Sequence, residues 1–298
     1  MNPFIFVFLD GFGLGDPTPS NPLFTSGITA FEEIAGNKLL KGIDVLKPEI
    51  LFKGIDASLG VDGLPQSATG QTALFTGKNA PEVLGFHLPA FPDKKLIELI
   101  RVHNILKKLS DAGYRSTFAN AYTDNYFEPA KLRKNMHSVT THCMLSAGLR
   151  LRKEKDLMED NAVYWDIIRE HFHINYNPQV MPIDPFCAGE HLVHICRSHE
   201  FVLFECFATD LVGHRCDSQR AEEILVTLDS FFDGVLKAKA SSTNLLICSD
   251  HGNFEDLRVK THTKNLVPLI VIGPDAHHFY SVERIDQVTP RILTLFGL

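Results

Sequence analysis

The chain has 298 residues, of which 44% are hydrophobic, and its formal net charge is −7. This length suits one large α/β domain or two small ones, and the apolar content favours a sizeable core over disorder. The negative charge comes without a basic block, which argues against a nucleic-acid platform and gives no support for a membrane-surface helix.

The N-terminal apolar run from Phe4 to Leu9 follows no cationic segment and ends at Asp10. It is too short for the core of a signal peptide or for a membrane span, so we expect a cytoplasmic protein without a membrane partner. The six cysteines are scattered and form no CxxC pair. We therefore expect reduced structural thiols rather than disulfides or metal ligands.

Apolar, strand-like runs alternate with amphipathic, helix-like runs along the chain. This alternation predicts one α/β domain over residues 1–298, with a mainly parallel central sheet and helices on both faces. The expected strands cover residues 2–9, 51–59, 114–122, 201–208, 245–248 and 267–272, and the expected helices cover residues 28–41, 94–113, 188–199, 219–236 and 284–296.

The segment from about residue 124 to 185 differs in character, because it is richer in charge and lacks strong strand patterns. We expect a small helical insertion, at most a cap over the main domain. Its basic residues most often form a solvated face. A minority of them are candidates to hold an anionic group of a substrate: Arg133, Lys134, Arg150 and Arg152.

Three aspartates, Asp10, Asp210 and Asp250, are expected directly after buried strands. Asp10 alone is explained equally well as a turn or helix cap. Together the three belong at one edge of a parallel sheet, where they repel one another strongly unless cations lie between them.

Three histidines, His214, His251 and His262, each lie within about a dozen residues of one of these carboxylates along the chain. His214 follows Asp210 by four residues, a spacing that brings both side chains to one face of a helix. Oxygen and nitrogen ligands without thiolate suit Zn²⁺ or Mn²⁺, and six of them suffice for two ions. Metal pairs about 4 Å apart serve displacement at phosphorus.

Ser67 stands where a loop rich in small and hydroxyl residues meets a predicted helix. A serine at such a junction is most often a plain N-cap. The same position also allows a nucleophile to meet a phosphate at the positive end of a helix. Metal ligands nearby raise the weight of this second interpretation.

Five segments resemble the motif set of the alkaline phosphatase superfamily, nearest to the metalloenzyme branch of cofactor-independent phosphoglycerate mutase and phosphopentomutase. They occur in the order of that family and lie near both ends of the chain, whereas residues 124–200 do not match those mutases. The segments are LDGFG (9–13), PQSATGQTALFTG (65–77), TDLVGH (209–214), SDHGN (249–253) and THTKNLVPLIVIG (261–273).

The resemblance implies a fold, two divalent metal ions and roles for particular residues. Ser67 would be the nucleophile that forms a phosphoserine intermediate, with Thr69 as the fallback. The diesterase-like members carry an asparagine three residues after the nucleophile, where this chain has Gly70. One metal would be held by Asp210, His214 and His262, and the other by Asp10, Asp250, His251 and the hydroxyl of Ser67.

The chain is far shorter than the phosphoglycerate mutases and shows no cluster that replaces their large inserted domain. A mutase must retain its dephosphorylated intermediate and exclude water. We therefore expect a two-metal phosphatase or phosphodiesterase acting on a small phosphate ester. The alternatives are a small-cap phosphomutase and a non-catalytic metal- or phosphate-binding protein on the same fold.

Overall fold

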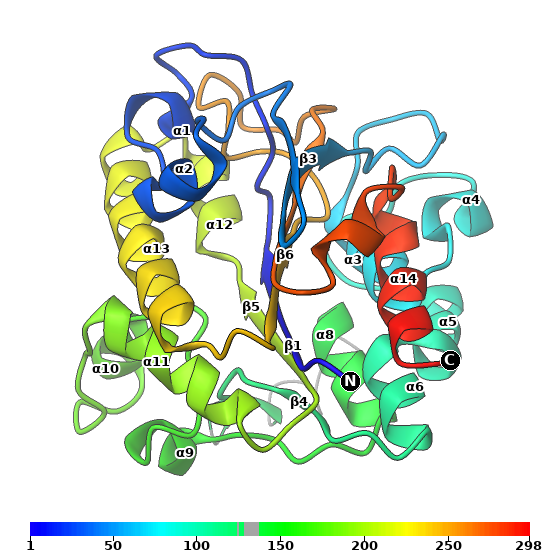
Figure 1. Cartoon of the computed structure of the whole chain (residues 1–298), viewed down its shortest axis with the longest axis vertical. Coiled ribbons are helices and arrows are strands. Elements are labelled where there is room, and N and C mark those ends of the chain that lie inside the picture. Colours follow the sequence, from blue (N-terminus) through cyan, green and yellow to red (C-terminus); the bar gives the residue numbers. More distant parts are fainter. Residues whose placement is uncertain (124, 128–136) are drawn as a thin grey trace.

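The computed structural model describes residues 1–123, 125–127 and 137–298, and a seven-stranded sheet lies at its centre (Figure 1). The strand order is β2-β3-β7-β6-β1-β5-β4. Strands β4, β5, β1, β6 and β3 point one way, while β7 and β2 run opposite to them. The strands are β1 (Phe4–Leu9), β2 (Asp44–Lys47), β3 (Ile50–Ile55), β4 (Ser116–Phe118), β5 (Phe201–Cys206), β6 (Asn244–Cys248) and β7 (Val267–Ile272).

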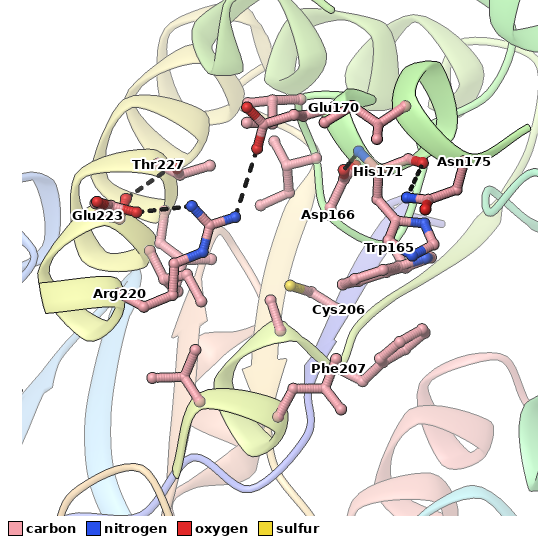
Figure 2. A pocket seen from close by; sticks show the side chains of 18 of the residues that line it. Trp165, Asp166, Glu170, His171, Asn175, Cys206, Phe207, Arg220, Glu223 and Thr227 are labelled. Carbon is pink, nitrogen blue, oxygen red and sulfur yellow. Dashed lines mark hydrogen bonds and ion pairs between the residues drawn. The ribbon is translucent and has the colours of Figure 1, made fainter. Parts of the chain in front are cut away.

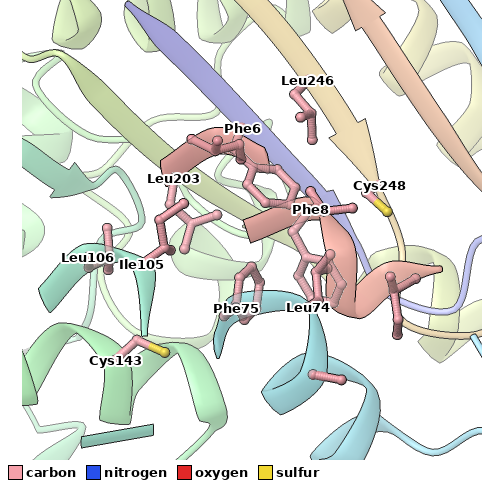
Figure 3. Packing of buried hydrophobic residues seen from close by; sticks show 14 of the residues in the cluster. Phe6, Phe8, Leu74, Phe75, Ile105, Leu106, Cys143, Leu203, Leu246 and Cys248 are labelled. Carbon is pink, nitrogen blue, oxygen red and sulfur yellow. The ribbon is translucent and has the colours of Figure 1, made fainter. Parts of the chain in front are cut away.

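The central strands are buried on both faces, which explains their continuous apolar sequences. Along β1 the side chains alternate between two cores. Phe6 and Phe8 pack with Phe75 and other residues on one face (Figure 3). Val7 belongs to the cluster on the opposite face, together with Phe204.

Helices cover both faces of the sheet (Figure 1), so the predicted α/β fold class is confirmed. On one face α13 packs along α11, and on the other α3 packs against α5 and α14. The helices are α1 (Pro22–Thr25), α2 (Thr29–Ala35), α3 (Ser67–Thr76), α4 (Ala80–Leu84), α5 (Lys94–His103), α6 (Ile105–Asp111), α8 (Val139–Ser146), α9 (Glu154–Met158), α10 (Glu170–Asn175), α11 (Pro185–Cys196), α12 (Ala208–Arg215), α13 (Ser218–Ala238) and α14 (Val288–Leu295), with short 3₁₀ turns η1 (Ala276–Phe279) and η2 (Ile285–Gln287).

Several predicted boundaries were wrong for local reasons. The single helix expected over residues 94–113 is two helices, because Asn104 adopts an extended conformation and caps α6 through the backbone N–H of Lys107. The helix expected over residues 28–41 ends at Gly36, which has a positive φ of 74°. Strand β2 was missed because most of its side chains are exposed at the edge of the sheet.

The segment predicted as a helical insertion contains the short helices α8, α9 and α10 in its described part. Arg133 and Lys134 lie outside the described residues. All six cysteines are free thiols, as expected. No helix within the described ranges is long and apolar enough to cross a membrane.

Candidate metal centre

The three predicted aspartates reach one edge of the sheet from three neighbouring strands. Asp10 directly follows β1, and Asp250 lies two residues beyond β6. The expected place of Asp210 was wrong: β5 ends at Cys206, and Asp210 lies in the first turn of α12. The helical spacing predicted for Asp210 and His214 is confirmed, since both lie on α12.

The first group of ligand atoms is buried and consists of Asp10, Asp250 and His251. His251 Nε2 lies 3.3 Å from Asp10 Oδ1 and 3.4 Å from Asp250 Oδ2. Neither of these two carboxylate oxygens has a hydrogen-bond partner among the described residues. The hydroxyl oxygen of Ser67 lies 3.0 Å from the same nitrogen.

The second group consists of Asp210, His214 and His262. His214 Nε2 is 3.3 Å from one Asp210 carboxylate oxygen and 3.2 Å from His262 Nε2. His262 Nε2 is 3.8 Å from the other Asp210 oxygen. The rings of His251 and His262 stack with centroids 3.7 Å apart, so the two groups adjoin.

Backbone carbonyls fix the orientation of the three imidazoles. The Nδ1 atoms of His262 and His214 lie 2.8 Å from the carbonyl oxygens of Pro65 and Lys260, respectively. His251 Nδ1 faces the Gly252 carbonyl at 3.4 Å. An Nδ1–H that donates to a carbonyl leaves the lone pair of Nε2 for a metal, which is the usual arrangement around histidine ligands.

The burial and the missing hydrogen-bond partners of these donor atoms fit a site for divalent cations. Buried carboxylate oxygens without partners are costly unless a cation or proton compensates them. Here two such oxygens face an imidazole nitrogen held in ligand orientation. The atoms of Asp210 and His262 also lie within 4.8 Å of His251, so this nitrogen approaches both groups.

Without a cation, the electrostatics of the centre favour the neutral forms. Burial, and then repulsion from Asp250 and Asp210, raises the pKa of Asp10 well above its usual value. Burial and the charge of Asp210 raise the pKa of Asp250 to about 8. Burial also lowers the pKa of His251 and of His262.

These shifts predict how the stability of the metal-free protein depends on pH. Above pH 7 the histidines are neutral in both the folded and the unfolded state, because their ordinary pKa is 6.5. The folded carboxyls still hold protons that the unfolded chain has lost, so the free energy of unfolding falls as pH rises from 7 to 9. The slope is up to about 1.4 kcal/mol per pH unit for each proton.

Urea unfolding in chelator at pH 7, 8 and 9 measures this slope, and Zn²⁺ or Mn²⁺ should abolish it by displacing the protons. A metal-free protein that becomes more stable over this range contradicts the prediction. Glu205, whose pKa burial raises to about 7, contributes with the same sign, so Glu205→Gln separates its share.

Three residues that support the centre were missed from the sequence. Gln71 donates to Asp10 Oδ2 at 3.3 Å, and Asn253 donates to Asp210 Oδ1 at 2.7 Å. Glu255, which is 1% exposed, accepts from the backbone N–H groups of Gly13 and Asn253 and from the side chains of Thr263 and Asn265. Gln71 and Asn253 lie inside two of the motif segments and Glu255 lies two residues beyond one, and this was the only signal in the sequence.

Gly70, three residues after Ser67 on α3, lies too close to Asp250 for any side chain to fit without movement. A Cβ atom at Gly70 would lie 2.7 Å from the carbonyl oxygen of Asp250 and 3.0 Å from its Cβ. Helix α3 therefore packs directly against the backbone that carries a candidate ligand.

We expect Gly70→Ala to displace Asp250 and to weaken metal binding by about 5- to 150-fold, since overpacking a rigid contact costs about 1–3 kcal/mol. Metal titration by calorimetry measures the loss. Gly36→Ala is a control for general destabilisation: the positive φ of Gly36 strains the substitution, but nothing lies within 4 Å of the added Cβ, so metal affinity should not change. Unchanged metal affinity in Gly70→Ala would contradict the packing argument.

The remaining predicted residues lie elsewhere. Thr69 is buried and its hydroxyl is bonded to the Gln66 carbonyl and the Leu88 N–H. Arg150 forms an ion pair with Asp156, while the buried guanidinium of Arg152 bonds to the carbonyls of Phe118 and Asn161. The structure therefore does not bring either arginine to the metal centre.

A cavity of about 450 Å³ opens beside the centre, and we call it the metal-side cavity. Asp10, Ser67 and Asp210 line it, so the candidate ligands and the hydroxyl face a space large enough for a small ester.

The fold and this edge of the sheet define an α/β protein with a candidate two-metal centre. Comparison with known proteins supports this assignment: residues 188–298 match the family model described as Metalloenzyme superfamily. The relationship predicted from the motifs is thereby confirmed for this part of the chain, which carries Asp210, His214, Asp250, His251 and His262.

The curated relatives are 2,3-bisphosphoglycerate-independent phosphoglycerate mutases. The one from Coxiella burnetii is 37% identical over 117 residues, which cover 36% of this chain and 22% of the relative. One from Yersinia pestis is 35% identical over 97 residues, covering 30% and 19%. The matched region is thus less than a quarter of the length of these relatives.

Solved structures resemble the whole chain. Alkaline phosphatase from the Antarctic bacterium TAB5 has a TM-score of 0.59 at 14% identity and covers 100% of this chain and 99% of its own. Phosphoglycerate mutase from Leishmania mexicana has a TM-score of 0.54 at 10% identity and covers 100% and 95%. At such identities the likeness concerns the fold.

Proposed function

We propose that this protein is a metal-dependent phosphatase or phosphodiesterase that acts on a small phosphate ester through a phosphoserine at Ser67. One observation carries the proposal: six carboxylate and imidazole side chains from both ends of the chain converge beside one hydroxyl at the mouth of a cavity.

The two groups of side chains would hold two divalent ions, Zn²⁺ or Mn²⁺. When bound, such ions stabilise negative charge on phosphoryl oxygens and lower the pKa of neighbouring hydroxyl groups. The division of ligands is the predicted one: Asp210, His214 and His262 for one ion, and Asp10, Asp250, His251 and Ser67 for the other.

Ser67 is the first residue of the ten-residue helix α3. The free N–H groups of the first turn and the helix dipole favour negative charge at its hydroxyl oxygen and on a bound phosphate. In the first step the bond from Ser67 Oγ to phosphorus forms while the ester oxygen leaves. In the second step water attacks phosphorus, and phosphate is released with the serine restored.

We favour hydrolysis over transfer because the described helices of the insertion are short, and a small cap does less to exclude water from a phosphoserine than the large domain of a mutase. A phosphomutase is the second candidate, because the curated relatives reported above are mutases. The hydrolase and the mutase hypotheses both require metal bound at Asp10 and Asp210.

The test is turnover of p-nitrophenyl phosphate and bis-p-nitrophenyl phosphate after loading with Zn²⁺ or with Mn²⁺. A phosphopentose and 3-phosphoglycerate are incubated in parallel, and free phosphate is distinguished from isomerised ester by NMR. Release of phosphate supports the hydrolase. Isomerised ester without free phosphate supports the mutase, and metal binding without turnover of any substrate rejects both.

A further inference from the structure

A second cavity, of about 560 Å³, lies next to the metal-side cavity and plays no part in the proposed chemistry (Figure 2). Four residues line both cavities: Trp165, Tyr176, Phe207 and Leu211. The indole of Trp165 stacks on the ring of Phe207 with centroids 4.3 Å apart and an interplanar angle of 18°. This aromatic pair therefore forms a wall common to both spaces.

Aromatic side chains make up much of the lining of the metal-side cavity. Tyr122, Tyr126, Tyr164 and Phe91 line it together with the shared pair. Tyr122 and Tyr126 meet edge to face with centroids 4.8 Å apart, and both phenol groups lie at the hydroxyl of Thr141. Aromatic surfaces in this arrangement favour a flat ring, which they contact by offset stacking or by its edge.

The charged groups of the two cavities are largely engaged elsewhere. Among the described residues that line the metal-side cavity, Asp10 and Asp210 are candidate metal ligands, and buried Glu205 accepts a hydrogen bond from Thr140. In the second cavity Arg220 is paired with Glu223 at 2.7 Å and Glu170 at 3.5 Å (Figure 2). The aromatic surfaces are therefore the main feature that these walls offer to a leaving group.

We infer that the substrate is a phosphate ester of an aromatic alcohol, whose ring lies against Trp165 and Phe207 while its phosphate faces Ser67. The second cavity gives room for a substituent on that ring. This inference rests on the proposed function, because it assigns the leaving group of the same reaction.

The experiment compares benzyl phosphate with cyclohexylmethyl phosphate in the metal-loaded protein. Both leaving groups are primary alcohols of similar size and acidity, so a difference in kcat/KM reports the flat ring and not the strength of the ester bond. We expect benzyl phosphate to be preferred about 2- to 12-fold, as an aromatic pair contributes about 0.5–1.5 kcal/mol beyond area. 3-Phosphoglycerate should be turned over more slowly than either.

Trp165→Leu and Phe207→Leu should each bring the benzyl-to-cyclohexylmethyl ratio close to one. Phe207 directly precedes the helix that carries Asp210, so Phe207→Leu also disturbs a candidate ligand. Trp165→Leu is therefore needed as a second variant of the aromatic pair. Phe24→Leu, at a half-exposed phenylalanine of α1, is the matched control and should keep the ratio. A ratio of one in the unmodified protein, or a ratio that both cavity variants leave unchanged, overturns the inference.

Binding separates failure of the inference from failure of the proposed function. Trp165 is the single tryptophan of the chain, so intrinsic fluorescence reports on the cavity wall. Benzylphosphonate, which cannot be hydrolysed, should change the emission at lower concentration than cyclohexylmethylphosphonate. If benzylphosphonate binds more tightly but no ester is turned over, the proposed hydrolase activity is wrong and the aromatic subsite is supported. Turnover of esters without any preference for benzyl compounds rejects the subsite alone.

Discussion

Ser67→Ala is expected to lower kcat for ester hydrolysis by at least about 10³-fold while both metals remain bound, because loss of a nucleophile removes the covalent step entirely. Ser67 is one of seven side chains at the centre, and its hydroxyl meets His251 Nε2 at 3.0 Å. The other six form two groups without it, so metal content by plasma mass spectrometry should stay near that of the unmodified protein.

The covalent step has its own readout. After acid quenching during turnover, the peptide that contains Ser67 should carry one phosphoryl group, and the Ser67→Ala protein should carry none. Ser26→Ala changes an exposed serine and should behave like the unmodified protein. Thr69→Val tests the fallback nucleophile and should still form phosphoserine, since the Thr69 hydroxyl is buried and already bonded. Near-normal hydrolysis by Ser67→Ala would remove this serine from the reaction.

The six candidate metal ligands could be predicted because each lies in or beside a short sequence motif that is recognisable without knowing the fold. A buried strand that stops at a carboxylate, as β1 does at Asp10, marks the sheet edge without any knowledge of pairing. Asp210 shows the limit of this signal. Helix α12 begins at Ala208, only two residues after β5 ends at Cys206, and the apolar run does not reveal where the strand ends and the helix starts.

The supporting residues could not be found in the same way, because their roles depend on contacts far apart in the sequence. Glu255 accepts from the backbone of Gly13, which is 242 residues away. The reversed direction of β7 was equally hidden, since a buried apolar strand has the same sequence pattern in either direction. Arg152 was misleading for a related reason: it resembled a surface cation, yet it bonds to buried backbone carbonyls.

Asp250→Asn is expected to have opposite effects on activity and on the stability of the metal-free protein. The amide keeps the shape of the carboxyl group but cannot serve as an anionic ligand, so we expect hydrolysis to fall by at least about 10³-fold. Asp250 Oδ2 is one of the two unpartnered oxygens that face His251, and the residue is fully buried. Metal titration should show the loss of one of the two ions.

Without metal the same substitution should stabilise the fold at pH 8 to 9 by on the order of 1–3 kcal/mol, because it removes a buried charge that Asp210 repels. Urea unfolding in chelator measures this gain, and Asp62→Asn, at an exposed aspartate, should show none. If Asp250 served only to hold the fold, its replacement would destabilise the protein both with and without metal. A metal ligand instead gives a variant that is more stable than the unmodified protein without metal and that metal stabilises less. A metal-free Asp250→Asn protein that is less stable would therefore contradict the role of ligand.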